Sequence, residues 1–480
     1  MSFNSLQFAL FFPAILLLLR WTDGWLKLSI LLAGNILFLQ VLGIQHSFFM
    51  VYVIATSYIA GILIEHFRER RQGTLVFLAA SVMLVIAPLI YFKYQAFIVC
   101  LMRLSSSRCD PTSYVETYSQ VLPLGISFYT LQAISYIVDV YFRRARCERN
   151  LLYFANFKSF FPQLVAGPIE RVTTLLPQLK KNFHATDTDL HAGFSLMVWG
   201  FFKKLVIADN LTSIVDPVFA DPQNFSASSL AVAVLAFTIQ IYCDFSGYTD
   251  IATGAARMMG IRLSLNFNNP YFATSITNFW RRWHISLSTW FRDYVYLPIG
   301  GARRGVVRMY IGLTAVFLIS GIWHGANFSF IAWALIHLLF LVIEKVSGIT
   351  RSGEPVQFRL VSIMQWMVTM CIVMVGWVFF RAKSVSDGLY ILETMALYWP
   401  SAAIIPGGNA ITPNSTSLAI GFGAALFMFL TEYLVSRSST GTVVSDTIRG
   451  RFKVIALYVL LLVTLVAGNF GRSAFIYFQF

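Results

Sequence analysis

The chain has 480 residues, of which 57% are hydrophobic and only 12% are charged, and its mean hydropathy is +0.67. Soluble globular proteins are about one quarter charged, so the composition excludes an ordinary soluble enzyme and indicates a single transmembrane domain over residues 1–480. The net charge of +14 comes from basic residues scattered between apolar stretches. Such residues belong in short loops beside anionic membrane lipids, and their scatter excludes a continuous stripe that binds nucleic acid.

Five apolar stretches in the first third are candidate membrane segments, since a span needs roughly 20 apolar residues. They are residues 6–19, 26–42, 48–64, 75–92 and 121–142. The first lacks a basic n-region and a small-residue cleavage site, so we expect it to be retained. Clusters of basic residues occur in the loops after every second predicted crossing of the membrane, so they lie on one side of the bilayer. The positive-inside rule then predicts an external N-terminus and an external loop over residues 95–120.

Residues 150–171 are apolar but are interrupted by Pro162, Gly167 and Pro168. Irregular backbone is tolerated at membrane depth only against protein or a water-filled cavity, so we predict a re-entrant or interfacial segment here. After a polar stretch, a helix follows whose Lys203 and Lys204 we expect to extend to the membrane interface.

Two carboxylates, Asp244 and Asp250, lie in the short run DFSGYTDIA. Buried charges in proteins are normally paired. We therefore favour a structural role, in which these carboxylates pair with arginines such as Arg281, Arg282 or Arg292, over a role in catalysis.

The densest polar cluster is NFWRRWHISLSTWFRDYVYLPIGGARR at residues 278–304. Wound as one helix, at about 100° per residue, it gathers aromatic side chains on one face and arginines on the other, with His284 on the seam. One interpretation is a helix in the membrane interface, with aromatic rings toward lipid and arginines toward phosphates. The alternative is a functional site.

A second polar cluster, SGIWHGANFSF at residues 320–330, interrupts two apolar stretches. Ionisable groups at membrane depth are costly and commonly mark function, which makes His324 a candidate functional residue. The alternative is a core histidine bonded to a neighbouring carbonyl. The flanking Gly321 and Gly325 suit a bent backbone or the close approach of a ligand.

Further apolar segments follow at residues 361–380, 418–434 and 454–467, and we expect residues 399–417 to form an extracytoplasmic loop. The whole pattern predicts an all-α polytopic protein with about ten to twelve membrane helices. The five cysteines form no CxxC pair and the seven histidines form no HxxxH or HExxH motif. We therefore expect neither a metal site nor a disulfide framework.

Several stretches together resemble the membrane-bound O-acyltransferases, and within them the alginate O-acetyltransferase membrane subunit group. The matching pieces occur in the family's order from about residue 120 onward. They are PLGISFYTLQAISYIVDVYFR at 123–143, FFPQLVAGPIER at 160–171, DFSGYTDIA at 244–252, NPYFATSITNFWRRWHISLSTWFRDYVYLPIGG at 269–301, SGIWHGANFSFIAW at 320–333 and FIYFQF at 475–480. The residues before about 100 match mainly in hydropathy.

The resemblance implies membrane helices, with re-entrant or interfacial segments among them, around a central and partly wet passage. It implies that His324 of the WHG motif is catalytic and that His284 of the RRWH motif lies near the same passage. At Asn278 the chain departs from the acidic residue that relatives often carry. The predicted substrate-binding residues are Arg281, Arg292, Trp323 and Asn327.

The chemistry of acyl transfer fits these residue types. When a hydroxyl attacks a thioester, its proton must be removed, and a neutral imidazole is a suitable base near pH 7. We predict His324 as this general base, because burial in an apolar helix keeps an imidazole neutral. His284, Arg281 and Arg292 are the candidates to orient the acceptor or to donate to the developing oxyanion.

The sequence therefore predicts a multi-pass O-acetyltransferase of the inner (cytoplasmic) membrane. It would move an acetyl group from a cytoplasmic thioester, acetyl-CoA or another, toward hydroxyls of an exported polysaccharide such as alginate. An extracytoplasmic, periplasmic acetyltransferase-type protein is the expected partner, and no tightly bound cofactor is expected.

Two alternatives remain from the sequence. One is D-alanyl transfer to teichoic acid, which another branch of the same family performs. The other is a transporter whose histidines and arginines line an anion pathway, although we find no inverted repeat of the kind common in secondary transporters.

Overall fold

A computed structural model describes residues 1–41, 43–69, 74–102, 123, 125–165, 167–348, 360–398, 415–437, 451–470 and 475. All the regular elements in these ranges are helices, which confirms the all-α prediction. The loop predicted at 399–417 lies almost wholly outside the described residues, and the loop predicted at 95–120 begins as helix α5 (Gln95–Met102) before it leaves them.

Among the described residues, eight helices are long and apolar enough to cross a membrane. They are His46–Arg68, Thr74–Tyr94, Asp187–Ala220, Ala227–Met258, Val306–His324, Phe328–Val346, Leu360–Arg381 and Thr416–Ser436. Three shorter apolar helices are Leu6–Arg20, Gly24–Gln40 and Val454–Ala467. The chain is therefore a polytopic membrane protein, and these helices agree with the predicted number of membrane segments.

The chain forms two compact units, and each is described by itself. Unit 1 consists of Met1–Met197 and Tyr248–Leu265, and unit 2 consists of Val198–Gly247 and Asn266–Phe480. The helices α11 (Asp187–Phe201) and α13 (Ala227–Met258) each contribute residues to both units.

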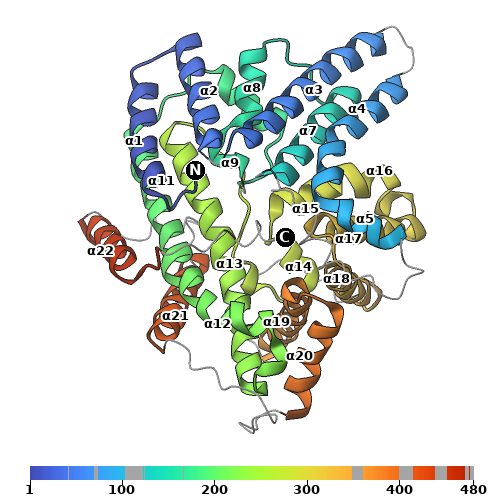
Figure 1. Cartoon of the computed structure of the whole chain (residues 1–480), viewed down its shortest axis with the longest axis vertical. Coiled ribbons are helices and arrows are strands. Elements are labelled where there is room, and N and C mark those ends of the chain that lie inside the picture. The colour runs from blue at the N-terminus through green and yellow to red at the C-terminus, as the bar shows by residue number, and fades with distance from the viewer. Residues whose placement is uncertain are drawn as a thin grey trace. The chain divides into compact units, whose positions relative to one another are not determined.

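In unit 1, α3, α4 and α7 lie side by side (Figure 1). Besides the parts of α11 and α13, the described helices of this unit are α1 (Leu6–Arg20), α2 (Gly24–Gln40), α3 (Ile44–Glu69), α4 (Thr74–Leu89) with the π-helix η1 (Ile90–Tyr94), α5, α7 (Ile126–Tyr141), α8 (Leu151–Ser159), α9 (Phe161–Leu164) and α10 (Val172–Lys180). Gly61 of α3 allows a close approach to α7, because a Cβ there would collide with the hydroxyl of Tyr136. The interruption predicted within 150–171 is confirmed as two short helices, while its depth in the membrane stays a prediction.

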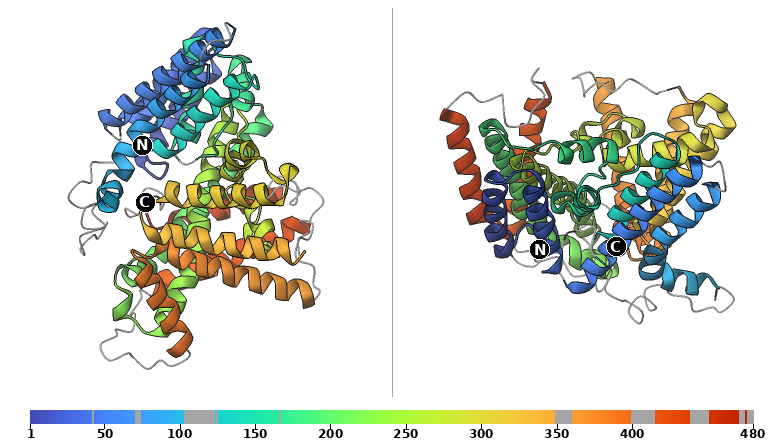
Figure 2. Two further views of the ribbon diagram at one scale, coloured as in Figure 1. Left: turned by 90° about the vertical axis from the view of Figure 1, so that its right-hand side faces the viewer. Right: turned by 90° about the horizontal axis from the view of Figure 1, so that it is seen from above.

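In unit 2, α17, α18 and α19 lie side by side, as the yellow-to-orange helices of Figure 2 show. The helices of this unit are η2 (Phe202–Ala208), α12 (Asp209–Ala220), η3 (Pro222–Asn224), η4 (Pro270–Phe272), α14 (Ile276–Trp280), α15 (Ile285–Phe291), η5 (Arg292–Tyr296), α16 (Leu297–Ile299), η6 (Ala302–Arg304), α17 (Val306–His324), α18 (Phe328–Val346), α19 (Leu360–Arg381), α20 (Val385–Tyr398), α21 (Ser415–Arg437) and α22 (Arg451–Ala467). Large aromatic side chains fill its core, with Trp283, Trp333 and Trp377 fully buried.

Lys203 and Lys204 are buried in the π-helix η2, so the prediction that they extend to the membrane interface is wrong. The Lys204 ammonium lies 2.7 Å from Asp209 Oδ1 and 2.5 Å from Asp244 Oδ1. These two buried carboxylates compensate the charge of Lys204, so its ammonium group does not need the water and phosphates of the membrane interface. Asp244 is paired, as expected for a buried charge, and the cation beside it is a lysine of a neighbouring helix.

Candidate active site

The segment that carries His284 is broken into short pieces, so the prediction of one continuous helix over residues 278–304 is wrong. Helix α14 ends at Trp280 and α15 begins at Ile285. Between them, the carbonyl of Arg282 accepts from Asn268 N, and Ile285 N donates to the carbonyl of Asn266, each at 2.9 Å. These bonds to residues 266–268 replace helical ones, and His284 turns the chain with φ of 44°, a left-handed conformation uncommon outside glycine.

The amide oxygen of Asn266 lies within hydrogen-bond distance of the His284 imidazole. His284 Nδ1 lies 3.0 Å from Asn266 Oδ1, which also accepts from Ser286 N at 3.3 Å and from Ser286 Oγ at 2.8 Å. Because this oxygen only accepts, Nδ1 carries the proton and Nε2 carries the lone pair in the neutral ring. The Phe245 ring packs against the imidazole in a T-shaped arrangement, with centroids 4.7 Å apart.

Burial keeps His284 neutral. Its side chain is 1% exposed, and desolvation lowers its pKa to about 3. At neutral pH, Nε2 is therefore a hydrogen-bond acceptor. His284 can orient a hydroxyl through its proton or accept that proton, whereas donation from Nε2 to an oxyanion would require the disfavoured imidazolium.

His324 is the last residue of α17 and is 6% exposed. Three aromatic rings surround its imidazole, with centroid distances of 4.9 Å to Trp323, 5.0 Å to Trp333 and 5.2 Å to Phe380. Each of these pairs is T-shaped. The histidine predicted from the WHG motif therefore lies in a buried aromatic environment of unit 2, and its role as a base stays a prediction.

Glycines and a cap fix the turn that follows His324. A Cβ on Gly325 would collide with the ring of Phe330, and one on Gly321 would lie 2.9 Å from the carbonyl of Phe330. Asn327 caps helix α18, which begins at Phe328. Its Oδ1 accepts from Ser329 N at 3.0 Å, and its Nδ2 donates to the carbonyl of Lys383 at 2.6 Å. Asn327 therefore helps to shape the turn, and its role toward substrate stays a prediction.

Trp323 brings the two histidines into one cluster. Its indole lies 4.9 Å from the ring of His324 and 6.5 Å from the ring of His284, between centroids. It is itself buried. The predicted residues His284, Trp323 and His324, which come from two separate motifs, are thus neighbours in unit 2.

Arg281 and Arg292 lie on the surface of unit 2. Both are exposed, and Arg292 Nε pairs with Asp293 Oδ1 at 2.8 Å. Exposed guanidinium groups suit contact with phosphate or carboxylate groups at a surface. Their predicted role in substrate binding is untested, and their exposure separates them from the buried rings around His324.

Four residues that the sequence alone did not single out lie around the two histidines: Asn266, Trp333, Phe380 and His337. His337 had a usable signal, because it is an ionisable residue within an apolar helix. Asn266 had none, since an asparagine in a loop is common. In the part of the chain that the structure describes, no group of three His, Cys, Asp or Glu side chains is arranged to hold a metal.

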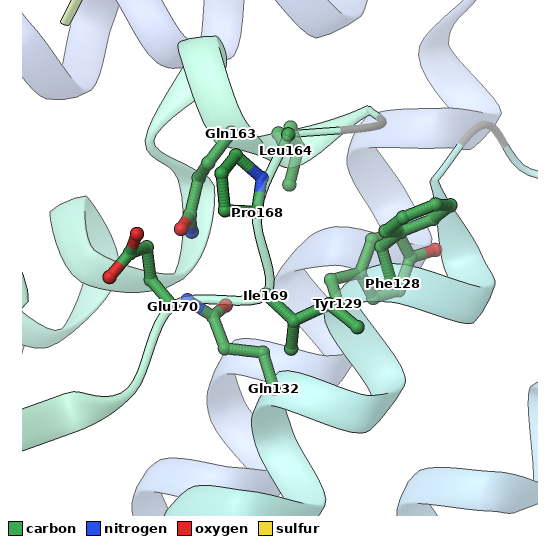
Figure 3. A pocket seen from close by; sticks show the side chains of 9 residues that line it. Phe128, Tyr129, Gln132, Gln163, Leu164, Pro168, Ile169 and Glu170 are labelled. Atoms are coloured by element: carbon green, nitrogen blue, oxygen red, sulfur yellow. The ribbon is translucent and has the colours of Figure 1, made fainter. Parts of the chain in front are cut away.

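A separate small pocket lies in unit 1, between α7, α9 and the loop after α9 (Figure 3). Its volume is about 10 Å³, enough for about one water molecule. Figure 3 shows the polar ends of Gln132, Gln163 and Glu170 gathered at one side. Burial raises the pKa of Glu170, whose carboxylate accepts from Ser264 N at 2.5 Å. The pocket contains none of the six predicted site residues.

Comparison with known proteins agrees with the resemblance in the motifs. The sequence model of the membrane-bound O-acyltransferase family matches residues 82–385. The chain is 37% identical over 397 residues to the probable alginate O-acetylase AlgI of Pseudomonas aeruginosa, which covers 82% of this chain and 75% of that protein.

Two other relatives act on different polymers according to their names. A peptidoglycan O-acetyltransferase of Helicobacter pylori is 36% identical over 331 residues, or 64% of this chain and 62% of that protein. A teichoic acid D-alanyltransferase of Bacillus subtilis is 27% identical over 285 residues, or 57% of this chain and 69% of that protein. The chain therefore belongs to the membrane-bound O-acyltransferase family.

Proposed function

We propose that this acyltransferase moves an acetyl group from a cytoplasmic acyl thioester to hydroxyls of an exported polysaccharide such as alginate. The observation that carries the proposal is the contact of two buried histidines, His284 and His324, with the single indole of Trp323. The similarity to an alginate O-acetylase over 82% of the chain supports acetate as the group and a polysaccharide as the acceptor.

In the proposed mechanism, His324 is the general base. It removes the proton from the acceptor hydroxyl as the oxygen attacks the thioester carbonyl carbon, and the resulting imidazolium later protonates the leaving thiolate. His284 Nε2 accepts a hydrogen bond from a second hydroxyl of the acceptor sugar and so orients the acceptor. Both histidines must be neutral before the reaction to accept hydrogen bonds or protons. The pKa of about 3 supports the neutral state of His284.

The surroundings of the reaction are part of the same proposal. The donor is acetyl-CoA or another acyl thioester, the location is the inner membrane, and an extracytoplasmic acetyltransferase-type protein receives or passes on the acetyl group. We propose that Arg281 and Arg292, which are exposed, contact an anionic part of a substrate. We also propose one functional domain, because the family match at 82–385 includes residues of both units.

The test is the acetate released from exported polysaccharide of cells that carry the intact gene, the His324→Ala variant or the His191→Ala variant. His191 is exposed on α11 and serves as the matched control. We expect acetate to disappear only with His324→Ala, at equal amounts of protein in the membrane. Normal acetylation in that variant would exclude His324 as the base.

A second candidate is D-alanyl transfer, which the similarity to the teichoic acid D-alanyltransferase of Bacillus subtilis supports. The same polymer samples distinguish the two, because mild alkali would release alanine in place of acetate. The transporter alternative is set aside, since the chain belongs to a family of acyltransferases.

A further inference from the structure

Three nitrogen-bearing rings of unit 2 contact one another. The ring centroids of Trp280 and Trp333 lie 5.7 Å apart, those of Trp280 and His337 lie 5.2 Å apart, and those of Trp333 and His337 lie 5.5 Å apart. Each pair meets edge to face. The three residues come from α14 and α18, so the packing of these two helices creates the group. We call it the Trp–Trp–His triangle.

Each ring of the triangle has a polar nitrogen that finds no protein partner among the described residues. These are Nε1 of Trp280, Nε1 of Trp333 and both ring nitrogens of His337, all of them buried. Buried indole and imidazole N–H groups usually find an acceptor. Three such groups in mutual contact therefore indicate a site for a ligand that supplies acceptor oxygen atoms.

The position of His337 is closely defined. It is 0% exposed, and its ring stacks on Phe279 with centroids 6.1 Å apart. A Cβ on Gly376 of α19 would lie 2.6 Å from His337 Nε2. The absence of a side chain at Gly376 therefore makes room for the imidazole, and the surrounding helices hold its orientation.

The triangle adjoins the proposed base. Trp333 contacts His337 on one side, and its ring centroid is also 5.0 Å from that of His324. When an acceptor hydroxyl bound at His324 attacks a thioester, the thioester carbonyl would therefore lie near the rings that carry these N–H donors. The indole N–H can only donate, which suits a carbonyl oxygen and suits a negatively charged oxygen better.

Acyl transfer requires such donors, because attack on a thioester moves negative charge onto the carbonyl oxygen. The other candidates fit poorly. His284 Nε2 accepts in the neutral ring, and Arg281 and Arg292 are exposed. We propose that Trp280, Trp333 and His337 form the oxyanion site that binds the acyl carbonyl oxygen during transfer. This inference rests on the proposed function.

The step is balanced. The acceptor oxygen forms a bond to the carbonyl carbon while its proton passes to His324, and the carbonyl π electrons move to the oxygen held by the triangle. The oxyanion then re-forms the carbonyl, the carbon–sulfur bond breaks, and the thiolate takes the proton from His324. The products are an ester and a free thiol. The triangle only donates hydrogen bonds, so it exchanges no proton.

The experiment uses membranes that contain the full chain together with the periplasmic fraction of the same cells, which supplies the extracytoplasmic partner, with acetyl-CoA as donor and the exported polysaccharide as acceptor. The variants are Trp333→Phe, Trp280→Phe and His337→Phe, each of which keeps an aromatic ring but loses the N–H. We expect each to lower kcat by about 100-fold with little change in KM. His337→Gln, which keeps an N–H donor, should recover part of that loss.

Trp377→Phe is the matched control. Trp377 lies in the same aromatic cluster, with its ring centroid 6.4 Å from that of Trp333, but its Nε1 donates to Tyr271 Oη at 3.1 Å. We expect this variant to keep kcat within a few-fold. If Trp333→Phe and His337→Phe match Trp377→Phe while the intact protein is active, the oxyanion site is wrong and the proposed function stands.

Two further outcomes complete the test. Equal losses in His337→Gln and His337→Phe would overturn the role of His337 as a donor. An intact protein that attaches no acetate, in membranes and in cells, would overturn both the proposed function and the oxyanion site. Membrane levels and thermal unfolding in detergent separate a loss of folding from a loss of donors.

Discussion

His284 and His324 lie against the same indole, that of Trp323, at centroid distances of 6.5 and 4.9 Å. Their motifs are separated along the chain by all of α15, η5, α16 and η6 and nearly all of α17. The contact explains why two polar clusters occur in an apolar sequence, since both supply side chains to one buried region. Four predictions follow from the atoms around this region and from the helices that hold it.

The amide of Asn266 determines the tautomer of His284. Replacing it with Ala removes the acceptor of His284 Nδ1 and of both Ser286 donors. We expect Asn266→Ala to lower kcat for acetyl transfer by at least about 10-fold, as loss of a group that orients a functional histidine does elsewhere. Asn268→Ala, an exposed neighbour, is the control. Equal rates in the two variants would show that the tautomer of His284 does not matter.

The buried state of His284 predicts a dependence of stability on pH. An unfolded histidine has a pKa near 6.5, whereas burial lowers the pKa of folded His284 to about 3. Below pH 6.5 the unfolded state binds a proton that the folded state does not, so the free energy of unfolding falls by about 1.4 kcal/mol per pH unit. This loss continues until the pH approaches 3.

Comparison of His284→Gln with the intact protein isolates this effect. Between pH 7 and pH 5, the intact protein should lose about 2 kcal/mol more stability than the variant. Denaturant unfolding of purified protein in detergent at the two pH values measures the difference. Identical losses in both proteins would mean that His284 is protonated in the folded state.

The ion pair network of η2 should dominate the stability of unit 2. Lys204→Met leaves the carboxylates of Asp209 and Asp244 buried without their shared cation. Breaking a buried pair in this way costs about 3–5 kcal/mol, which thermal unfolding in detergent can detect. Combining Lys204→Met with Asp244→Asn removes one of the two buried charges that the loss of Lys204 leaves uncompensated. The double variant should therefore be more stable than the sum of the single effects, and simple additivity would argue against the network.

The turn after His324 should tolerate no side chain at Gly325. Its Cβ would overlap the ring of Phe330, so Gly325→Ala must displace that ring or the turn that carries His324. Acetyl transfer should fall by about 10-fold or more, as misplacement of a reacting group by about 1 Å does. Gly423→Ala on α21 is the control, because nothing lies within 4 Å of its Cβ position. That variant should keep its activity and gain up to about 1 kcal/mol of stability.

Local patterns in the sequence were enough to predict the fold class and the family. Apolar stretches of membrane length determine helices wherever they occur, because the backbone must bond internally in lipid. Pro162 and Pro168 predicted the interruption before α10 in the same local way. The motifs around His284 and His324 likewise needed no tertiary information, since their residues are contiguous.

The tertiary structure decided where those helices break and what the buried polar groups contact. Backbone hydrogen bonds from residues 266–268 replace helical ones between α14 and α15, where His284 turns the chain. The carboxylates of Asp209 and Asp244 hold Lys204 inside unit 2. Helix packing brings Trp280 into contact with Trp333 and His337. Each contact joins residues distant in sequence, so no local periodicity reports it. The sequence by itself determined the helices and the chemistry of the side chains, and long-range packing determined which of them meet.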